Sequence, residues 1–194
     1  MTIDKVTQDD PNPLTECYTN DMVVKVIDDV VSKGYQNLIE NTICSPNFNW
    51  SYITGLTFND DSNTGFVNKI FSSEHQFRTP ETDLLIPLLY EAIDKYEKGL
   101  VVKDLYRIIA RMNLKGQNKS KHLPHIDVEF PHYTMVYYVN DSDLGTNIHE
   151  GDKIIQNVEH KKGRAVIMSG DVLHSSSTPK KSLNRVVLNF NFMI

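Results

Sequence analysis

Three residues in the second half of the sequence have the types and spacing of a metal site. His125 and Asp127 are separated by one residue, and His174 follows the glycine-containing turn Ser169–Asp171. On a strand, residues i and i+2 point to the same face, so the imidazole and the carboxylate would converge. Two histidines and one carboxylate on one face of an octahedron leave three positions open. That arrangement suits non-haem Fe(II) with a bidentate ligand and dioxygen.

Arg185 adds a second chemical function to this set. It lies eleven residues after His174 and begins the run RVVLNFNF, which predicts a strand. An arginine inside a barrel is costly unless it has a partner, and its planar guanidinium fits a carboxylate in bidentate geometry. We therefore expect a dicarboxylic co-substrate that chelates the metal at one end and contacts Arg185 at the other. The HxD pair alone is a weak pattern, whereas these four positions in order are specific.

The elements that must position these residues are predicted to be strands. Alternating apolar residues, glycines and short polar clusters give strands over 105–114, 122–128, 133–140, 154–158, 164–168 and 185–192. Many short strands at this spacing are typical of a double-sheet barrel or sandwich, including the jelly roll. We expect a mainly β fold with flanking α-helices.

The first half of the chain carries the helical signals. Apolar spacing after Asn20 and Asp21, ending at Gly34, predicts a capped amphipathic helix. A second helix is predicted over Asp83–Lys98, with Pro87 in its first turn or at a kink. The polar stretch Asn59–Gln76 between them is interpreted as a loop or flap.

Length and composition define the broad class of the protein. The 194 residues contain no linker or repeat and suit one domain, 1–194, in which 1–100 is mostly helical support and 101–194 forms the β core with the metal site. The net charge of -5 disfavours nucleic acid as a partner. No signal-peptide pattern and no apolar run of roughly 20 residues is present, so we expect a cytoplasmic protein without membrane contact.

From about Leu105 to its end, the sequence resembles the 2-oxoglutarate/Fe(II)-dependent dioxygenase superfamily, specifically its prolyl-hydroxylase-like branch. The strings YTMVYYVND, GRAVIMSGDVLHSSSTP and NRVVLNFNF carry the resemblance. The N-terminal half is similar to small members encoded by bacteriophages, which would place the protein in a host cytoplasm. The resemblance implies a double-stranded β-helix (jelly-roll) core. It also implies that His125, Asp127 and His174 bind Fe(II), and that Arg185 and Tyr138 bind 2-oxoglutarate.

The resemblance further implies hydroxylation of a C–H bond with release of succinate and CO2. A peptidyl proline or another amino-acid residue in a protein is the first substrate expected. A free amino acid or small metabolite is the second, and nucleic-acid demethylation ranks third. Dioxygen is the second co-substrate, and ascorbate is a candidate accessory cofactor. Two alternatives stay open: a non-catalytic jelly-roll binding or phage structural protein, and a cupin-like metalloprotein that needs no 2-oxoacid.

Several positions depart from the family pattern or stay ambiguous. Val187 stands where some members have a hydroxyl that shares the carboxylate with the arginine, and the usual Gly-Gly-Glu-Thr run is reduced to Leu144–Asn147. Asp127 is retained, which disfavours halogenation. Arg107 and Arg111 share one strand face, and either could contact substrate or form a surface ion pair. The remaining histidines are assigned to the surface or the surroundings of the site; His75, His149 and His160 are expected to be solvated.

Overall fold

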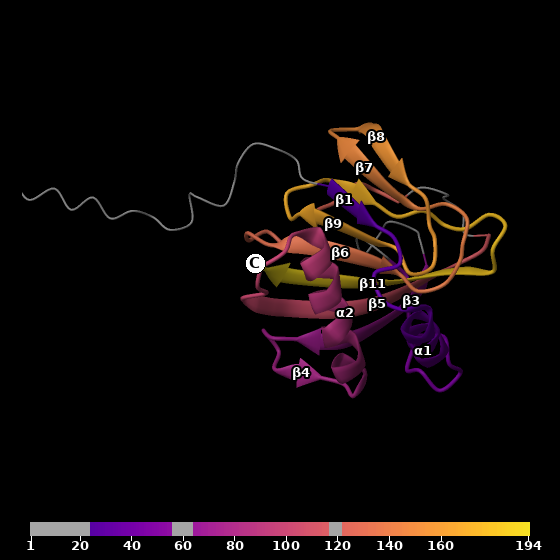
Figure 1. Cartoon of the computed structure of the whole chain (residues 1–194). Helices are drawn as coiled ribbons and strands as arrows, with labels where there is room; N and C mark the ends of the chain where they lie inside the picture. The colour runs from indigo at the N-terminus through magenta and orange to yellow at the C-terminus, as the bar shows by residue number, and fades with distance from the viewer. Residues whose placement is uncertain (1–23, 56–63, 117–121) are drawn as a thin grey trace, which may run out of the picture.

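The computed structural model describes residues 24–55, 64–116 and 122–194. Within these residues two antiparallel sheets form the framework (Figure 1). The strands are β1 (Val24–Ile27), β2 (Ser51–Ile53), β3 (Gly65–Ser72), β4 (Phe77–Arg78), β5 (Asp104–Leu114), β6 (Tyr133–Tyr138), β7 (Thr146–Glu150), β8 (Lys153–Val158), β9 (Ala165–Ser169), β10 (His174–Ser175) and β11 (Asn184–Met193). The helices are α1 (Lys33–Ile43) and α2 (Glu81–Tyr96).

The larger sheet has the strand order β1-β9-β6-β11-β5-β3-β2, with β4 paired to β3. The smaller sheet has the order β10-β7-β8. An isolated bridge between His125 and His174 extends the smaller sheet by one residue. This double-sheet arrangement is the jelly-roll type that the strand pattern predicts.

One face of the larger sheet packs against both helices. Because side chains alternate along each strand, every second residue faces the helices. These residues are Ile108 and Ala110 of β5, Met135 and Tyr137 of β6, Ile167 of β9, and Val186, Leu188, Phe190 and Phe192 of β11. They form a single buried cluster with Ile39 of α1 and Leu85, Leu88 and Leu89 of α2. This cluster makes the main hydrophobic core.

The alternate residues of the same strands face the smaller sheet. Val136, Tyr138, Val166, Met168 and Val187 pack here with Ile148 of β7 and Val158 of β8 in a second cluster. Further along the sheet, the same face of β11 and β5 carries polar and charged residues instead. The sheet therefore separates a helix-packed core from a face that can hold a site. Neither helix in the described ranges has the length and apolar character to cross a membrane.

Five of the predicted strands are confirmed to within two residues by β5, β6, β8, β9 and β11. The second predicted helix is α2, shifted two residues toward the N-terminus, and Pro87 lies beyond its first turn. β7 was not predicted, although it brings Thr146 to the site described below.

The predicted helix ending at Gly34 is wrong over its described part. Val24–Ile27 forms β1, which pairs with β9 at the edge of the larger sheet. The run of β-branched residues favours a strand, where such side chains pack well. The helix begins later: Ser32 caps α1 by accepting a hydrogen bond from the Tyr35 N–H, and Gly34 lies inside that helix.

The loop predicted for Asn59–Gln76 is also wrong in part. Residues 59–63 lie outside the described residues, but Gly65–Ser72 forms β3, which pairs with β5 and buries Ile70 completely. Together with β1, β2 and β4, this strand shows that the first hundred residues contribute to the larger sheet as well as supplying helices. The polar residues before Gly65 obscured the alternating pattern of the strand itself.

The predicted strand over 122–128 does not form. In this segment only His125 makes a β-bridge, to His174, through two backbone hydrogen bonds of 3.0 Å. The convergence of His125 and Asp127 therefore comes from an irregular segment attached to β10 at one residue, and not from strand alternation.

Candidate metal centre and co-substrate pocket

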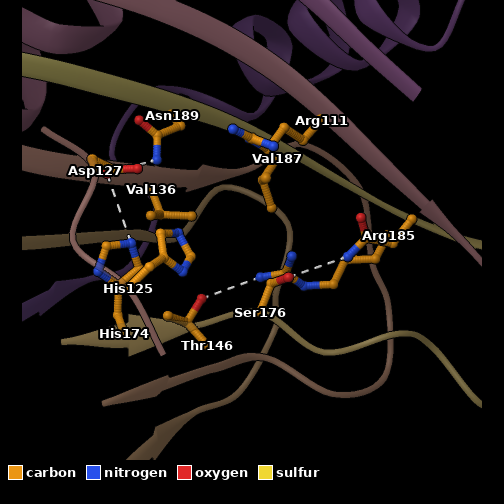
Figure 2. Close-up of a pocket in the computed structure, with 11 residues that line it drawn as sticks. Arg111, His125, Asp127, Val136, Thr146, His174, Ser176, Arg185, Val187 and Asn189 are labelled. Atoms are coloured by element: carbon orange, nitrogen blue, oxygen red, sulfur yellow. Dashed lines mark hydrogen bonds and ion pairs between the residues drawn. The ribbon is translucent and has the colours of Figure 1, made fainter. Parts of the chain in front are cut away.

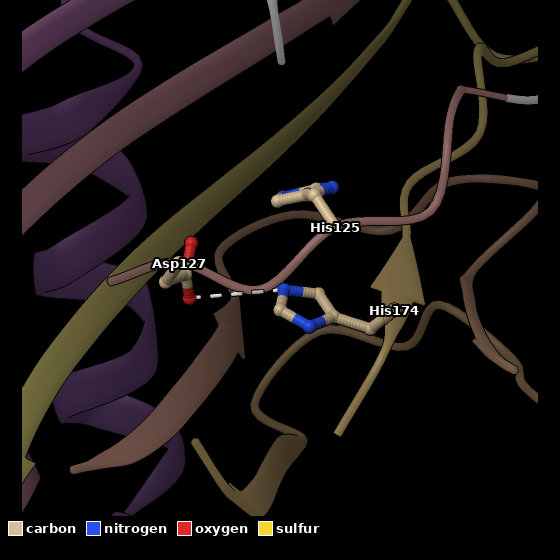
Figure 3. Close-up of side chains that lie close together, drawn as sticks. All are labelled: His125, Asp127 and His174. Carbon is tan, nitrogen blue, oxygen red and sulfur yellow. Dashed lines mark ion pairs between the residues drawn. The ribbon is translucent and has the colours of Figure 1, made fainter. Parts of the chain in front are cut away.

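The structure brings the three predicted metal ligands together. One ligand atom from each of His125, Asp127 and His174 lies within 4.8 Å of the others (Figure 3). The Asp127 and His174 side chains are only 4% and 6% exposed. His174 begins β10, while His125 and Asp127 come from the segment that faces it. The arrangement joins parts of the chain that are nearly fifty residues apart in sequence.

Backbone contacts set the orientation of both imidazoles. Nδ1 of His125 lies 3.2 Å from the Leu123 carbonyl oxygen, and Nδ1 of His174 lies 3.0 Å from that of Val172. A carbonyl oxygen only accepts, so each Nδ1 must carry the proton. In a neutral ring with this tautomer, Nε2 carries the lone pair that a metal ligand needs.

The carboxylate of Asp127 is held by three neutral donors and one cation. Its Oδ2 accepts hydrogen bonds from Thr134 (2.9 Å), Asn189 (3.0 Å) and Asn191 (3.1 Å). Nη2 of Arg107 lies 3.3 Å from Oδ1 and donates to the Asp127 backbone oxygen at 3.0 Å. These contacts fix the carboxylate before any metal arrives.

The protonation states also fit metal binding. Burial and the neighbouring His174 lower the pKa of His125 to about 4, so its imidazole is neutral at physiological pH. Burial alone would raise the pKa of Asp127, but His174, Arg107 and the other donors around it outweigh that effect and keep its pKa below the usual range. The centre thus offers the neutral imidazole of His125 and the carboxylate of Asp127 beside the His174 ring.

Arg185 lies at the other end of the same cavity (Figure 2). It is 2% exposed, its Nη2 donates to the Thr146 hydroxyl at 3.1 Å, and its Nε has no hydrogen-bond partner in the described structure. Burial lowers the pKa of its guanidinium. No carboxylate pairs with it among the described residues, so its charge is a strong candidate to meet an anionic ligand.

Tyr138 lies behind this pocket. Its hydroxyl donates to Thr146 at 2.8 Å, its ring lies 5.6 Å from the Arg185 guanidinium carbon, and burial raises its pKa. The cavity is lined by Arg111, Asn113, His125, Asp127, Val136, Thr146, His174, Ser176, Arg185, Val187 and Asn189. Tyr138 is not among these residues, because Thr146 lies between its hydroxyl and the cavity. Direct contact of Tyr138 with a co-substrate therefore stays a prediction.

Sequence reasoning missed four residues that shape this site. Thr146 lies in the run Leu144–Asn147 that replaces the family's Gly-Gly-Glu-Thr, and its hydroxyl could have been found by comparing the two runs. Asn189 and Asn191 alternate on β11 with apolar residues, which indicates a polar inward face. Arg107, left open between substrate contact and surface ion pair, pairs with Asp127 instead of a surface partner.

Two of the histidines expected to be solvated are buried. His149 lies in β7 and contacts Ser175 at 2.9 Å, and His160 contacts the Asn140 carbonyl oxygen at 2.8 Å and stacks on Tyr138. Both segments look polar in sequence, but the fold closes over them. Only His75 is exposed as expected.

No protein-family model matches the sequence, and no curated protein matches it. Solved structures do share its fold. A 2OG-Fe(II) oxygenase family oxidoreductase from Burkholderia pseudomallei superposes with a TM-score of 0.67 at 12% identity, covering 89% of this chain and 84% of its own.

Two further structures show the same fold with different bound molecules. A prolyl hydroxylase from Trichoplax adhaerens, in complex with a hypoxia inducible factor peptide fragment, has a TM-score of 0.61 at 10% identity over 87% of this chain and 83% of its own. The epimerase SnoN from nogalamycin biosynthesis, in complex with Fe3+, alpha ketoglutarate and nogalamycin RO, has a TM-score of 0.61 at 11% identity over 88% and 78%. The chain therefore has the fold of the 2OG-Fe(II) oxygenases, and the predicted jelly-roll core is confirmed.

Proposed function

We propose that this protein is an Fe(II)- and 2-oxoglutarate-dependent dioxygenase that hydroxylates a C–H bond. The observation that carries the proposal is the content of one cavity. It has a His-Asp-His cluster at one end and, at the other, a buried arginine that no carboxylate of the described residues contacts. A metal-binding module without a 2-oxoacid would explain the cluster but not Arg185. The shared fold supports the same class.

The residues present fit both groups. Nε2 of His125, Nε2 of His174 and the Asp127 carboxylate would hold iron, with Thr134, Asn189 and Asn191 fixing the carboxylate. Arg185 and Thr146 would bind the far carboxylate of 2-oxoglutarate, and Tyr138 would orient Thr146. When bound, iron and 2-oxoglutarate supply the oxidation of substrate by dioxygen, with loss of CO2 and formation of succinate.

A peptidyl residue, such as proline, or an amino acid is the proposed substrate. A prolyl hydroxylase with a bound peptide shares the fold, which supports a peptide. The second candidate is a small molecule, because SnoN shares the fold to the same extent with a small molecule bound. Ascorbate would serve only to keep the iron reduced.

An anaerobic absorbance titration tests the metal and co-substrate together. Apo-protein receives Fe(II) and then 2-oxoglutarate, with Asp127→Ala, Arg185→Ala and the surface control Arg78→Ala in parallel. We expect a weak visible charge-transfer band in the wild type and the control, with loss or strong weakening in both site variants. A folded, iron-loaded wild type without the band would refute the 2-oxoglutarate assignment and favour a cupin-like or non-catalytic protein.

A further inference from the structure

A second cavity lies beside the candidate metal centre. It has a volume of about 360 Å³ and is lined by Lys69, Phe71, Ser72, Glu74, His75, Phe77, Arg107 and Ile109. These residues come from β3, β4, β5 and the turn between β3 and β4. Arg107 connects the two sites, since this residue lines the second cavity and its Nη2 lies 3.3 Å from the Asp127 Oδ1. The Arg107 side chain therefore lies between a molecule in the second cavity and the Asp127 carboxylate.

The register of the sheet gathers positive charge at this place. Lys69 of β3 is directly opposite Ile109 of β5, and Arg107 and Arg111 lie two residues to either side of Ile109 on the same face. Diagonal neighbours in a regular antiparallel pair are roughly 7–8 Å apart, within reach of long side chains. This spacing applies to Lys69 and Arg111, while the β-bulge between Lys69 and Phe71 lies on the side of Arg107.

Arg111 has an interaction partner of its own, whereas the charges of Lys69 and Arg107 are only partly balanced within the described structure. Lys69 is exposed and has no hydrogen-bond or ion-pair partner among the described residues. Glu74 also lines the cavity, but its side chain is 86% exposed and its contact is with His75. Asp127 partly balances Arg107. Like charges this close favour an anion between them.

The proposed cofactors do not supply that anion. Fe(II) carries two positive charges and 2-oxoglutarate two negative ones, so together they leave the charge of the site unchanged. Arg185 would bind the 2-oxoglutarate carboxylate in the first cavity. Lys69 and Arg107 are then left to the substrate in the second cavity. This local excess of positive charge at Lys69 and Arg107 contrasts with the net charge of -5 for the whole chain.

We propose, resting on the dioxygenase assignment above, that the substrate is an acidic peptide segment. One of its carboxylates binds beside Lys69 in the cavity between β3 and β5 while a neighbouring residue reaches the metal centre. Phe71, Phe77 and Ile109 give the cavity apolar walls that suit the carbon chain of such a segment. The negative charge of the whole protein opposes a polyanion such as nucleic acid, which requires an extended positive field.

Fluorescence anisotropy can test this proposal without any turnover. The probes are three labelled peptides, identical except that a central proline is flanked by glutamate, glutamine or lysine. We expect the wild type to bind the glutamate peptide about two- to fivefold more tightly than the glutamine peptide, as one exposed charge contact provides. Added salt should reduce the difference. The lysine peptide should bind most weakly.

Variants of one exposed residue locate the effect. Lys69→Glu should abolish the preference for the glutamate peptide, and Lys69→Arg should retain it. Lys153→Glu makes the same charge change on β8, away from both cavities, and should leave the preference intact. Circular dichroism of each variant checks that it is folded.

Three outcomes would overturn the proposal: equal binding of the glutamate and glutamine peptides or no peptide binding, a preference that survives Lys69→Glu, or tighter Lys69-dependent binding of a single-stranded oligonucleotide. Failure of the dioxygenase assignment is seen separately, as loss of the iron–2-oxoglutarate absorbance band in the wild type. A wild type with the band but without the glutamate preference refutes the acidic substrate alone.

Discussion

Arg185 illustrates how a single residue can serve function at the expense of stability. Its guanidinium is buried against Thr146 and the Tyr138 ring, without a carboxylate partner in the described structure. Burying a charge without a counter-ion is unfavourable, and apolar replacements of buried charges are often neutral or stabilising. If the arginine exists to bind 2-oxoglutarate, the ligand-free protein should tolerate its removal.

We predict that Arg185→Met raises the free energy of unfolding of the ligand-free protein by about 1–3 kcal/mol. The additional increase in Tm that 2-oxoglutarate produces over Fe(II) alone in the wild type should disappear. Urea denaturation and anaerobic thermal unfolding measure the two effects. Arg164→Met is the matched control. Because Arg164 forms an ion pair with Asp28, this variant should be less stable than the wild type. A loss of stability in Arg185→Met would mean that the guanidinium is structural.

The residues that could be predicted from sequence are those with a distinctive type and spacing. His125, Asp127, His174 and Arg185 stand out because two histidines, a carboxylate and an arginine follow one another in a characteristic order. Apart from Arg107, the groups that hold Asp127 are neutral amides and a hydroxyl, which occur anywhere in a sequence. Only the pairing of β11 with β6, which sets Asn191 opposite Thr134, shows that they converge.

At the scale of elements, the start of β7 positions the pocket around Arg185. Gly145 precedes Thr146, and a Cβ on Gly145 would lie 1.6 Å from the Val158 backbone oxygen at the end of β8. Backbone atoms cannot rotate away as a flexible side chain can, so β7 or β8 would have to move. Thr146 would move with β7, and its contact with Arg185 would be disturbed.

We predict that Gly145→Ala destabilises the protein by about 2–4 kcal/mol and weakens 2-oxoglutarate binding at least tenfold. Urea denaturation and the iron–2-oxoglutarate absorbance titration check the two parts. Gly151→Asn is the control in the β7–β8 turn: its φ is 56°, which asparagine tolerates, and nothing lies within 4 Å of an added Cβ. Equal stability of both variants and the wild type would argue against a tight β7–β8 contact.

Element prediction succeeded where local pattern and tertiary partner agree. β5 and β11 alternate cleanly because one face meets the helices and the other meets the site. The prediction for β1 was wrong because its apolar residues also fit a helical spacing, and only pairing with β9 decides between helix and strand. The prediction for β3 was wrong because the polar residues before Gly65 suggested a loop, and the burial of this strand depends on β5. The bridge at His125 likewise depends on a partner distant in sequence.

At the scale of the whole molecule, one face of the larger sheet forms the hydrophobic core and the other face carries the candidate site. The face under α1 and α2 is apolar and provides most of the buried hydrophobic area. The other face buries polar and ionisable groups that contribute little to stability. Among these is His160, whose ring stacks on Tyr138 at 4.2 Å between centroids and lies near Arg185. Such groups make the stability of the fold depend on pH.

Burial, assisted by Arg185, lowers the pKa of His160 from 6.5 to about 2. Below pH 6.5 the unfolded chain therefore binds a proton that the folded protein does not, so the free energy of unfolding falls as pH falls. Between pH 7 and pH 5 this single group should cost about 2 kcal/mol. Asp28, whose pKa Arg164 lowers to about 2, begins to act only below its ordinary value of 3.8 and does not enter this range.

We predict that the free energy of unfolding of His160→Gln falls by about 2 kcal/mol less than that of the wild type between pH 7 and pH 5. The glutamine amide can still donate to the Asn140 carbonyl oxygen. Urea denaturation at several pH values measures the slope. His75→Gln, at an exposed histidine, should keep the wild-type slope. Parallel curves for wild type and His160→Gln would mean that His160 can take up a proton in the folded protein. The surroundings of Arg185 would then have to tolerate a second buried cation, although Arg185 and His160 are only 2% and 7% exposed.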